Sequence, residues 1–365
     1  MMGGPEAVDT AVRSHLFPPL GPIFPRTYEE GRALWEAALA RVELPVARRD
    51  FPCPEEPGLA TATALLGDPT APGLLAVLGG THGVEGFAGT TLQCDLLWRL
   101  ACGQLRLPEG VAVLLVDALN PWGYRHFHRH DRQGVDLNRN FIDFANPPDN
   151  PDYPAIRALL ACPPGPERRA ALAEAAERLG RQRFEIAATG GQYQDPRGPF
   201  YGGRAPAHGR RVVEALLAEL ALGARRAVAV VDVHTGLGPW CHAEVVCDHP
   251  PESRGFALAA RWFGPALGAP ALGNSSSVPK WGLIDYAFHA ALGESGCFVT
   301  LEFGTYGTEA LLEVLWDDLP DPEGAPRPGS EALRRHFWPE DPVWREAMVL
   351  RGRQVLDQAL AGVTP

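Results

Sequence analysis

The stretch Leu74–Leu97, LLAVLGGTHGVEGFAGTTLQCDLL, decides the fold of this chain. Its apolar run 74–78 is typical of a buried strand, and the leucines of 88–101 recur at helical spacing. A short glycine-rich turn between these two segments carries His82 and Glu85. Ligands in open α/β sheets bind where strands end and helices begin, so a His and a Glu three residues apart at this point can both reach one metal ion.

Composition narrows the classes of protein to which the chain can belong. Its 365 residues are 45% hydrophobic, which is enough for one large α/β domain. The net charge of −11 argues against a nucleic-acid partner, and no run is long enough to cross a membrane. Residues 1–17 lack the pattern of a signal peptide, and the seven cysteines form no CxxC pair. We therefore expect a cytoplasmic protein with reduced thiols. Arginine far outnumbers lysine, which we interpret as compositional bias.

The order of apolar runs predicts a mixed, mainly parallel twisted sheet flanked by helices, in a single domain spanning residues 1–365. Its core is expected at about 45–320, between a helical N-terminal lead-in and a helical C-terminal extension. The proline-rich segment 51–60 is expected to be an edge or loop, and 146–166 to be irregular. The expected strands are 74–78, 111–116, 227–233, 243–247 and 297–301. The expected helices are 28–42, 88–101, 167–183, 210–222, 308–316, 331–337 and 343–361.

Polar residues follow several of these strands where each strand stops. They are His82 with Glu85, the Asn-Arg-Asn segment 138–140, His234 and Glu302. Each alone has an ordinary structural explanation, such as a cap or a hydrogen-bonded strand-end residue. Because a doubly wound sheet brings the carboxyl ends of its strands to one edge, their shared position indicates a single site.

The residue types at these strand ends suit one kind of chemistry. Two His and one carboxylate form the ligand set of a catalytic zinc site, which leaves the fourth position for water. A carboxylate outside that set, for which Glu302 is well placed, can take the proton of the water and pass it to a leaving amine. Arginines within 125–139 can stabilise an oxyanion or hold a substrate carboxylate.

Four motifs together resemble the zinc carboxypeptidase (M14) superfamily. They are HGVE at 82–85, VDLNRNF at 135–141, DVHTG at 232–236 and LEFGT at 301–305. The segment HGVEGFAGT is similar to the bacterial DUF2817 branch of that superfamily. HxxE alone is nonspecific, but the four motifs in this order are specific, and the resemblance covers roughly residues 45–310.

The resemblance implies one Zn²⁺ ion, a general base and a carboxylate-binding pair. Glu302 would be the general base, and Asn138 and Arg139 would bind the terminal carboxylate of the substrate. The zinc ligands would be His82, Glu85 and His234.

Two further active-site residues of the superfamily, an arginine and a tyrosine, have no single clear counterpart in this sequence. Its oxyanion-stabilising arginine matches Arg129 best by offset, with Arg125 and Arg132 as rivals in the same loop. Ser277 aligns with a tyrosine that closes over the substrate in the family. That role is therefore either vacant or filled from elsewhere, by Tyr286, Tyr193 or Tyr201.

The leading hypothesis is a zinc-dependent hydrolase of amide bonds, of the metallocarboxypeptidase type, acting on a peptide with a free carboxylate. The first alternative is an N-acyl amino-acid deacylase, similar to aspartoacylase and succinylglutamate desuccinylase. That branch carries a C-terminal β-domain, whereas the last sixty-odd residues here have helical spacing. A non-catalytic binding protein of the same fold is the second alternative. The chain lacks GxGxxG, GK[ST] and GxSxG, which argues against a phosphate-binding loop and a serine nucleophile elbow.

Several residues near these motifs have a structural as well as a functional interpretation. Asp232 either orients His234 or is an ordinary strand-end residue, and Asp136 is expected to be structural. Gly83 and Gly86 are expected to keep bulk away from the metal. Three alternating histidines invite a second metal site, but we expect them to pack beside aromatic residues; they are His126, His128 and His130.

Overall fold

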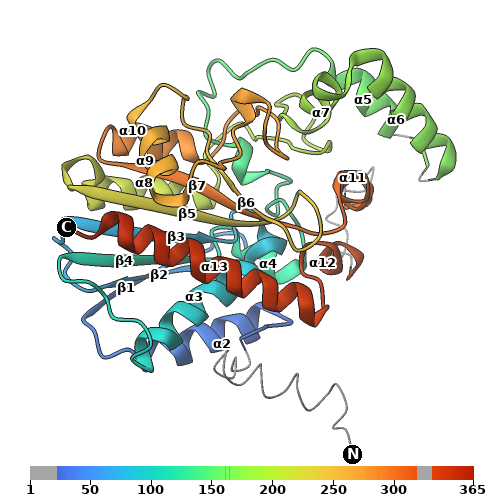
Figure 1. The fold of residues 1–365 in the computed structure, drawn as a ribbon. Helices are drawn as coiled ribbons and strands as arrows, with labels where there is room; N and C mark the ends of the chain where they lie inside the picture. Colours follow the sequence, from blue (N-terminus) through green and yellow to red (C-terminus); the bar gives the residue numbers. More distant parts are fainter. Residues whose placement is uncertain (1–22, 161, 164, 319–330) are drawn as a thin grey trace, which may run out of the picture.

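The computed structural model describes residues 23–160, 162–163, 165–318 and 331–365 (Figure 1). The first 22 residues of the expected lead-in, and with them the segment that lacks a signal-peptide pattern, lie outside the described residues. Positions 319–330 of the expected C-terminal extension lie outside them as well.

The described part of the chain forms a seven-stranded sheet of order β1-β2-β4-β3-β5-β7-β6. Its four central strands β4, β3, β5 and β7 run parallel, and the remaining pairings are antiparallel. The prediction of a mixed, mainly parallel sheet flanked by helices is confirmed. The strands are β1 (Val46–Pro52), β2 (Ala60–Leu66), β3 (Gly73–Gly79), β4 (Val111–Asp117), β5 (Ala227–Gly236), β6 (Ala243–Val246) and β7 (Gly296–Gly304).

Helices cover both faces of this sheet (Figure 1). One face packs on α2 (Tyr28–Leu39), α3 (Gly86–Ala101), α9 (Arg254–Phe263) and α13 (Pro342–Val363). The other face packs on α8 (His208–Leu220) and α10 (Asp285–Leu292). Both faces of the central strands are therefore buried, which explains why these strands are continuous apolar runs in the sequence.

The remaining helices lie beyond the carboxyl ends of the strands or on the side of the molecule. They are α4 (Pro121–His126), α5 (Tyr153–Leu160), α6 (Pro166–Leu179), α7 (Arg181–Thr189), α11 (Thr308–Asp317) and α12 (Glu331–Phe337). None of the helices in the described part combines the length and hydropathy that a membrane span requires. All seven cysteines are free of disulfide bonds.

The C-terminal helix α13 is fixed to α3 by ion pairs. The guanidinium group of Arg353 donates to both carboxylate oxygens of Asp95, at 2.8 and 2.6 Å. Arg99 forms a second link, donating to Asp357 at 2.8 Å. Paired contacts of this kind hold a planar guanidinium in one orientation, so polar contacts fix α13 to α3 while its apolar face packs in the core.

Several segments differ from the sequence-based expectation, and two of them have a clear local cause. The helix expected at 167–183 is broken at Gly180, where a φ of +82° ends α6 and α7 begins. The segment 146–166, expected to be irregular, contains α5. Its Pro154 lies in the first helical turn, where a missing N–H costs nothing, so a proline-rich segment can still begin a helix there.

Candidate active site

The turn after β3 is held in place by the loop after α4. Its backbone N–H groups at Gly83 and Val84 donate to the carbonyl oxygens of Arg129 and His128, at 3.2 and 2.9 Å. A 3₁₀ turn at Gly83–Glu85 then leads directly into α3. The backbone that carries His82 and Glu85 is therefore fixed from two sides.

The glycines of this turn serve packing against α4. A Cβ atom on Gly83 would lie 2.2 Å from the backbone carbonyl carbon of Gly123. A Cβ atom on Gly86 would lie 2.6 Å from the ring of Tyr124. The expectation that these glycines keep bulk away from a metal is therefore wrong, because α4 occupies the space that side chains would need.

Replacement of Gly83 by alanine should lower the free energy of unfolding by about 1–3 kcal/mol, the usual cost of overpacking. The clash is with backbone, so α4 or the turn must move, and metal affinity should fall with it. Urea denaturation with and without added zinc measures both effects. If the variant has the same free energy of unfolding as the wild type, the backbones at Gly83 and Gly123 can move apart without loss of stability.

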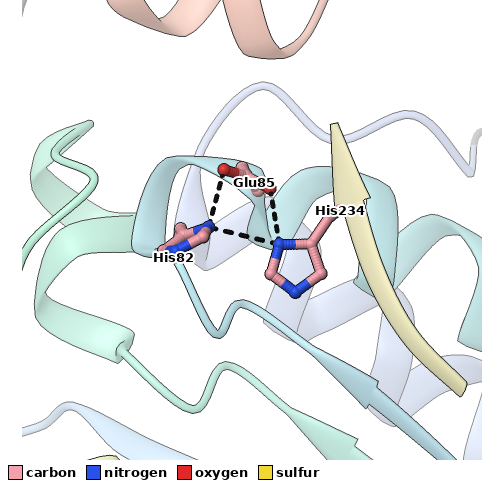
Figure 2. Close-up of side chains that lie close together, drawn as sticks. All are labelled: His82, Glu85 and His234. Carbon is pink, nitrogen blue, oxygen red and sulfur yellow. Dashed lines mark hydrogen bonds and ion pairs between the residues drawn. The ribbon is translucent and has the colours of Figure 1, made fainter. Parts of the chain in front are cut away.

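Three side chains from two elements converge at the end of β3 and β5 (Figure 2). The Nδ1 atom of His82 lies 2.9 Å from Glu85 Oε1 and 3.2 Å from Nδ1 of His234. Glu85 Oε2 lies 3.2 Å from the same His234 nitrogen. Ligand atoms around a tetrahedral zinc ion are about 3.3 Å apart for bonds of 2.0–2.1 Å. The spacing and the donor types therefore both fit zinc.

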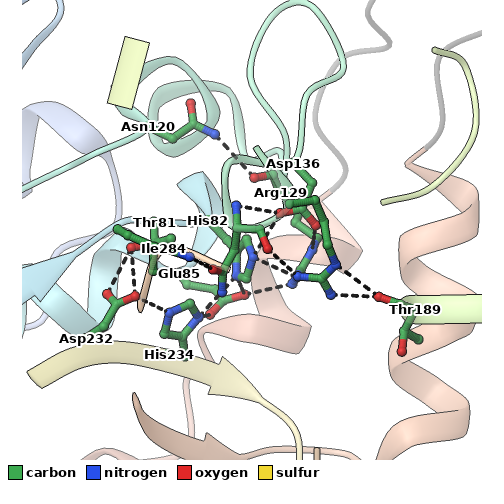
Figure 3. A network of polar contacts seen from close by, with 12 residues as sticks. Thr81, His82, Glu85, Asn120, Arg129, Asp136, Thr189, Asp232, His234 and Ile284 are labelled. Atoms are coloured by element: carbon green, nitrogen blue, oxygen red, sulfur yellow. Dashed lines mark hydrogen bonds and ion pairs between the residues drawn. The ribbon is translucent and has the colours of Figure 1, made fainter. Parts of the chain in front are cut away.

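Carboxylates hold the far side of both imidazoles (Figure 3). Asp232 Oδ2 lies 2.6 Å from Nε2 of His234, and Thr81 donates to Asp232. Asp136 Oδ1 lies 3.2 Å from Nε2 of His82, and Nη2 of Arg129 lies 2.7 Å from the same nitrogen. At His234, a carboxylate that accepts the Nε2 proton leaves the Nδ1 lone pair free for a metal. Asp232 thus takes the orienting position, and Asp136, expected to be only structural, contacts His82.

Replacement of Asp232 by asparagine should weaken zinc binding about 10- to 100-fold, as loss of a carboxylate behind a ligating His does elsewhere. Competition with a chromophoric chelator measures this dissociation constant. Asp248→Asn is the matched control, because Asp248 lines the same cavity after β6 but is not hydrogen-bonded to a ligand. Equal zinc affinity in the two variants would argue against an orienting role for Asp232.

Glu302 lies beside the three converging side chains, on β7, the strand next to β5. It is directly opposite His234 in the parallel β5–β7 pair and is 8% exposed. Its Oε1 accepts a hydrogen bond from the Leu237 N–H at 2.9 Å. Burial, followed by the nearby Glu85 carboxylate, raises the pKa of Glu302 to about 7. A carboxylate with such a pKa exchanges protons readily near neutral pH.

The structure distinguishes the three candidate arginines, of which Arg125 lies in α4 and the other two in the loop after it. Arg129 donates from Nε to Asp136 at 3.0 Å and from Nη1 to Glu85 at 3.2 Å (Figure 3). Arg125 is paired with Glu29 at the surface, and Arg132 donates to the backbone carbonyl of residue 55. Of the three, only Arg129 reaches the converging side chains within the described part of the chain.

Arg139 is a buried cation in the same cavity, 1% exposed. It donates to the carbonyl oxygens of Thr189 and Asn138, using three of its five N–H groups. No carboxylate among the described residues lies within 4.0 Å of it. Asn138 also lines this cavity, and its Oδ1 accepts from the Ile284 N–H at 2.9 Å. A buried guanidinium without an anion is costly, so this position suits a ligand carboxylate.

The open cavity around these groups is lined by a charged residue that sequence reasoning missed, Lys280. Lys280 is the only lysine of the chain, and it donates to Ser277 Oγ and to the carbonyl of Val278. Burial, together with the Arg139 guanidinium, lowers the pKa of Lys280 to about 7. Its solitary occurrence in an arginine-rich chain was the available signal. The candidate tyrosines Tyr193, Tyr201 and Tyr286 are not among the described residues that line the cavity.

Comparison with known proteins gives a family and a fold. The family model described as "Protein of unknown function (DUF2817)" matches residues 24–351. No curated protein matches. Carboxypeptidase A from Helicoverpa armigera is similar in structure, at 13% identity over 98% of this chain and 80% of that chain, with a TM-score of 0.53. For thrombin activatable fibrinolysis inhibitor, identity is 12%, coverage is 98% and 80%, and the TM-score is 0.50. At these identities, the likeness is one of fold.

Proposed function

The chain belongs to the DUF2817 family and has a fold like that of the zinc carboxypeptidases, and we propose that it is a zinc-dependent amide hydrolase of the metallocarboxypeptidase type. One observation carries the proposal. Two imidazole nitrogens and a carboxylate converge at the spacing of zinc ligands, with a further buried carboxylate beside them.

The proposed ligands are His82, Glu85 and His234. When bound, zinc supplies a Lewis acid that polarises a carbonyl group and lowers the pKa of water. Glu302 takes a proton from the attacking water and delivers it to the departing amine nitrogen. The guanidinium group of Arg129, held by Asp136, stabilises the negative charge that develops on the carbonyl oxygen.

Substrate recognition in this proposal rests on the buried pair Asn138 and Arg139. The two N–H groups that Arg139 does not spend on backbone carbonyls can donate to one carboxylate. The substrate is therefore a peptide with a free C-terminal carboxylate, and the reaction releases its last residue. The single cavity joins this anion position to Glu302 and to the proposed ligands, as cleavage next to a terminal residue requires.

A paired hydrolysis screen tests the proposed function. The zinc-loaded protein is offered peptides with free and with amidated C-termini, and a set of N-acyl amino acids. Release of C-terminal residues from free peptides, lost with chelation and restored by zinc, is the expected result. Hydrolysis of N-acyl amino acids alone would assign the deacylase function instead. If the protein binds zinc but hydrolyses neither class of substrate, the result would favour a non-catalytic binding protein.

A further inference from the structure

A second cluster of metal-ligating side chains lies outside the site described above. His128 and His130 follow α4, and Asp318 follows α11 at a separation of 190 residues from His128. His128 Nδ1 lies 2.7 Å from Asp318 Oδ1, and His130 Nε2 lies 3.7 Å from Asp318 Oδ2. One ligand atom from each of the three residues lies within 4.8 Å of the other two.

Two atoms in this cluster face each other and have no hydrogen-bond partner among the residues that the structure describes. They are His130 Nε2 and Asp318 Oδ2, and the Asp318 side chain is only 3% exposed. His130 Nδ1 lies 2.7 Å from the carbonyl oxygen of Asp131, so it carries the ring proton. In the neutral imidazole, Nε2 then presents a lone pair to a carboxylate oxygen. Two opposed buried lone pairs are unfavourable unless a proton or a metal cation lies between them, and the separation of 3.7 Å is too long for a hydrogen bond.

Stacking fixes the orientation of the two imidazole rings. Trp122 stacks on His128 with ring centroids 5.1 Å apart and on His130 at 6.3 Å. The expectation that these histidines pack beside an aromatic residue is therefore confirmed. His126 packs on the same tryptophan but pairs with Glu56 at 2.7 Å, outside the cluster. The sequence alone could not show that Asp318 lies beside His128 and His130.

We propose that His128, His130 and Asp318 bind a second divalent transition-metal ion of the zinc class. Two imidazoles and one carboxylate are a ligand set that Zn²⁺ accepts. The distances among the ligand atoms bracket the spacing of about 3.3 Å around a tetrahedral zinc ion. His130 and Asp318 also line a small cavity.

Because of where this cluster lies, a metal ion bound there would stabilise part of the candidate active site. It would join the loop after α4 to the end of α11, and Arg129 lies between the two histidines. The same loop holds the turn after β3 through backbone hydrogen bonds to Gly83 and Val84. The ion would therefore support both Arg129 and the turn that carries His82 and Glu85, without contacting substrate.

Zinc stoichiometry tests this inference independently of the proposed function. The full-length protein is loaded with Zn²⁺, freed of weakly bound metal, and analysed by mass spectrometry of the metal. We expect two equivalents in the wild type, one in His234→Ala and one in Asp318→Asn. The double variant should bind none. His126→Gln, at the end of α4 and outside the cluster, is the matched control and should retain two.

Two outcomes would overturn the inference: a single equivalent in the wild type that His234→Ala removes, or a second equivalent that survives Asp318→Asn and His130→Gln. Folding is checked separately by circular dichroism. In the His234→Ala background, zinc should raise the melting temperature, and adding Asp318→Asn should abolish that rise. No rise with zinc in the His234→Ala protein would likewise count against the second site.

Discussion

Replacement of Glu302 by glutamine should lower kcat by about 10²–10⁴-fold, the range that general acid–base catalysis contributes. The amide retains the shape of the side chain but cannot take a proton from water. Zinc content should stay at the wild-type level, because Glu302 is not among the three converging ligands. Steady-state kinetics on a free peptide, with metal analysis of the same sample, measures both quantities.

Glu244→Gln is the matched control for this variant. Glu244 is a buried carboxylate directly opposite Glu302 on the antiparallel strand β6, and it accepts from the Ser276 N–H. Its replacement perturbs the same sheet edge without touching the proposed chemistry, so kcat should remain close to wild type. Hydrolysis at the wild-type rate in Glu302→Gln would refute the general-base role. An equal loss in both variants would attribute the effect to the strand pair.

Replacement of Arg139 by alanine should lower kcat/KM on peptides with a free carboxylate about 10²-fold. This corresponds to the loss of about 3 kcal/mol, as expected for hydrogen bonds to a charged group. Amidated peptides, which offer no anion, should lose much less. Because both substrates are compared in one variant, any loss of stability from the missing bonds to Thr189 cancels in the ratio. Equal losses on both would argue against a carboxylate clamp.

The parallel centre of the fold was predictable because its strands are long apolar runs. Periodicity located β3, β4, β5 and β7, and parallel pairing then required their carboxyl ends to share one edge. Strand β2 was missed because its small residues, ATATALL, give a weak apolar signal. The break at Gly180 was missed because the helical pattern of the flanking residues continues across it.

Loop residues of the candidate site were harder to predict for a physical reason. The residues proposed as ligands and base lie within or just after the carboxyl ends of parallel strands, so sheet topology alone brings His82, His234 and Glu302 together. Lys280 and Asp318 reach their places through the paths of loops and of α11, which depend on packing rather than on local pattern. The place of Asp136 beside both His82 and Arg129 depends on the same kind of packing.

The candidate site has a rigid part on β5 and β7, which are the longest strands of the described sheet, and an adaptable part on the connecting segments. These strands continue in register as far as Gly236 and Gly304, so His234 and Glu302 stand within regular sheet. Arg129, Arg139 and Lys280 instead stand on connecting segments outside the sheet. Connecting segments generally accept more sequence change than strands do, so differences in substrate choice are expected to arise there. For the same reason, engineering of specificity should begin with the segment around Lys280 and leave the two strands unaltered.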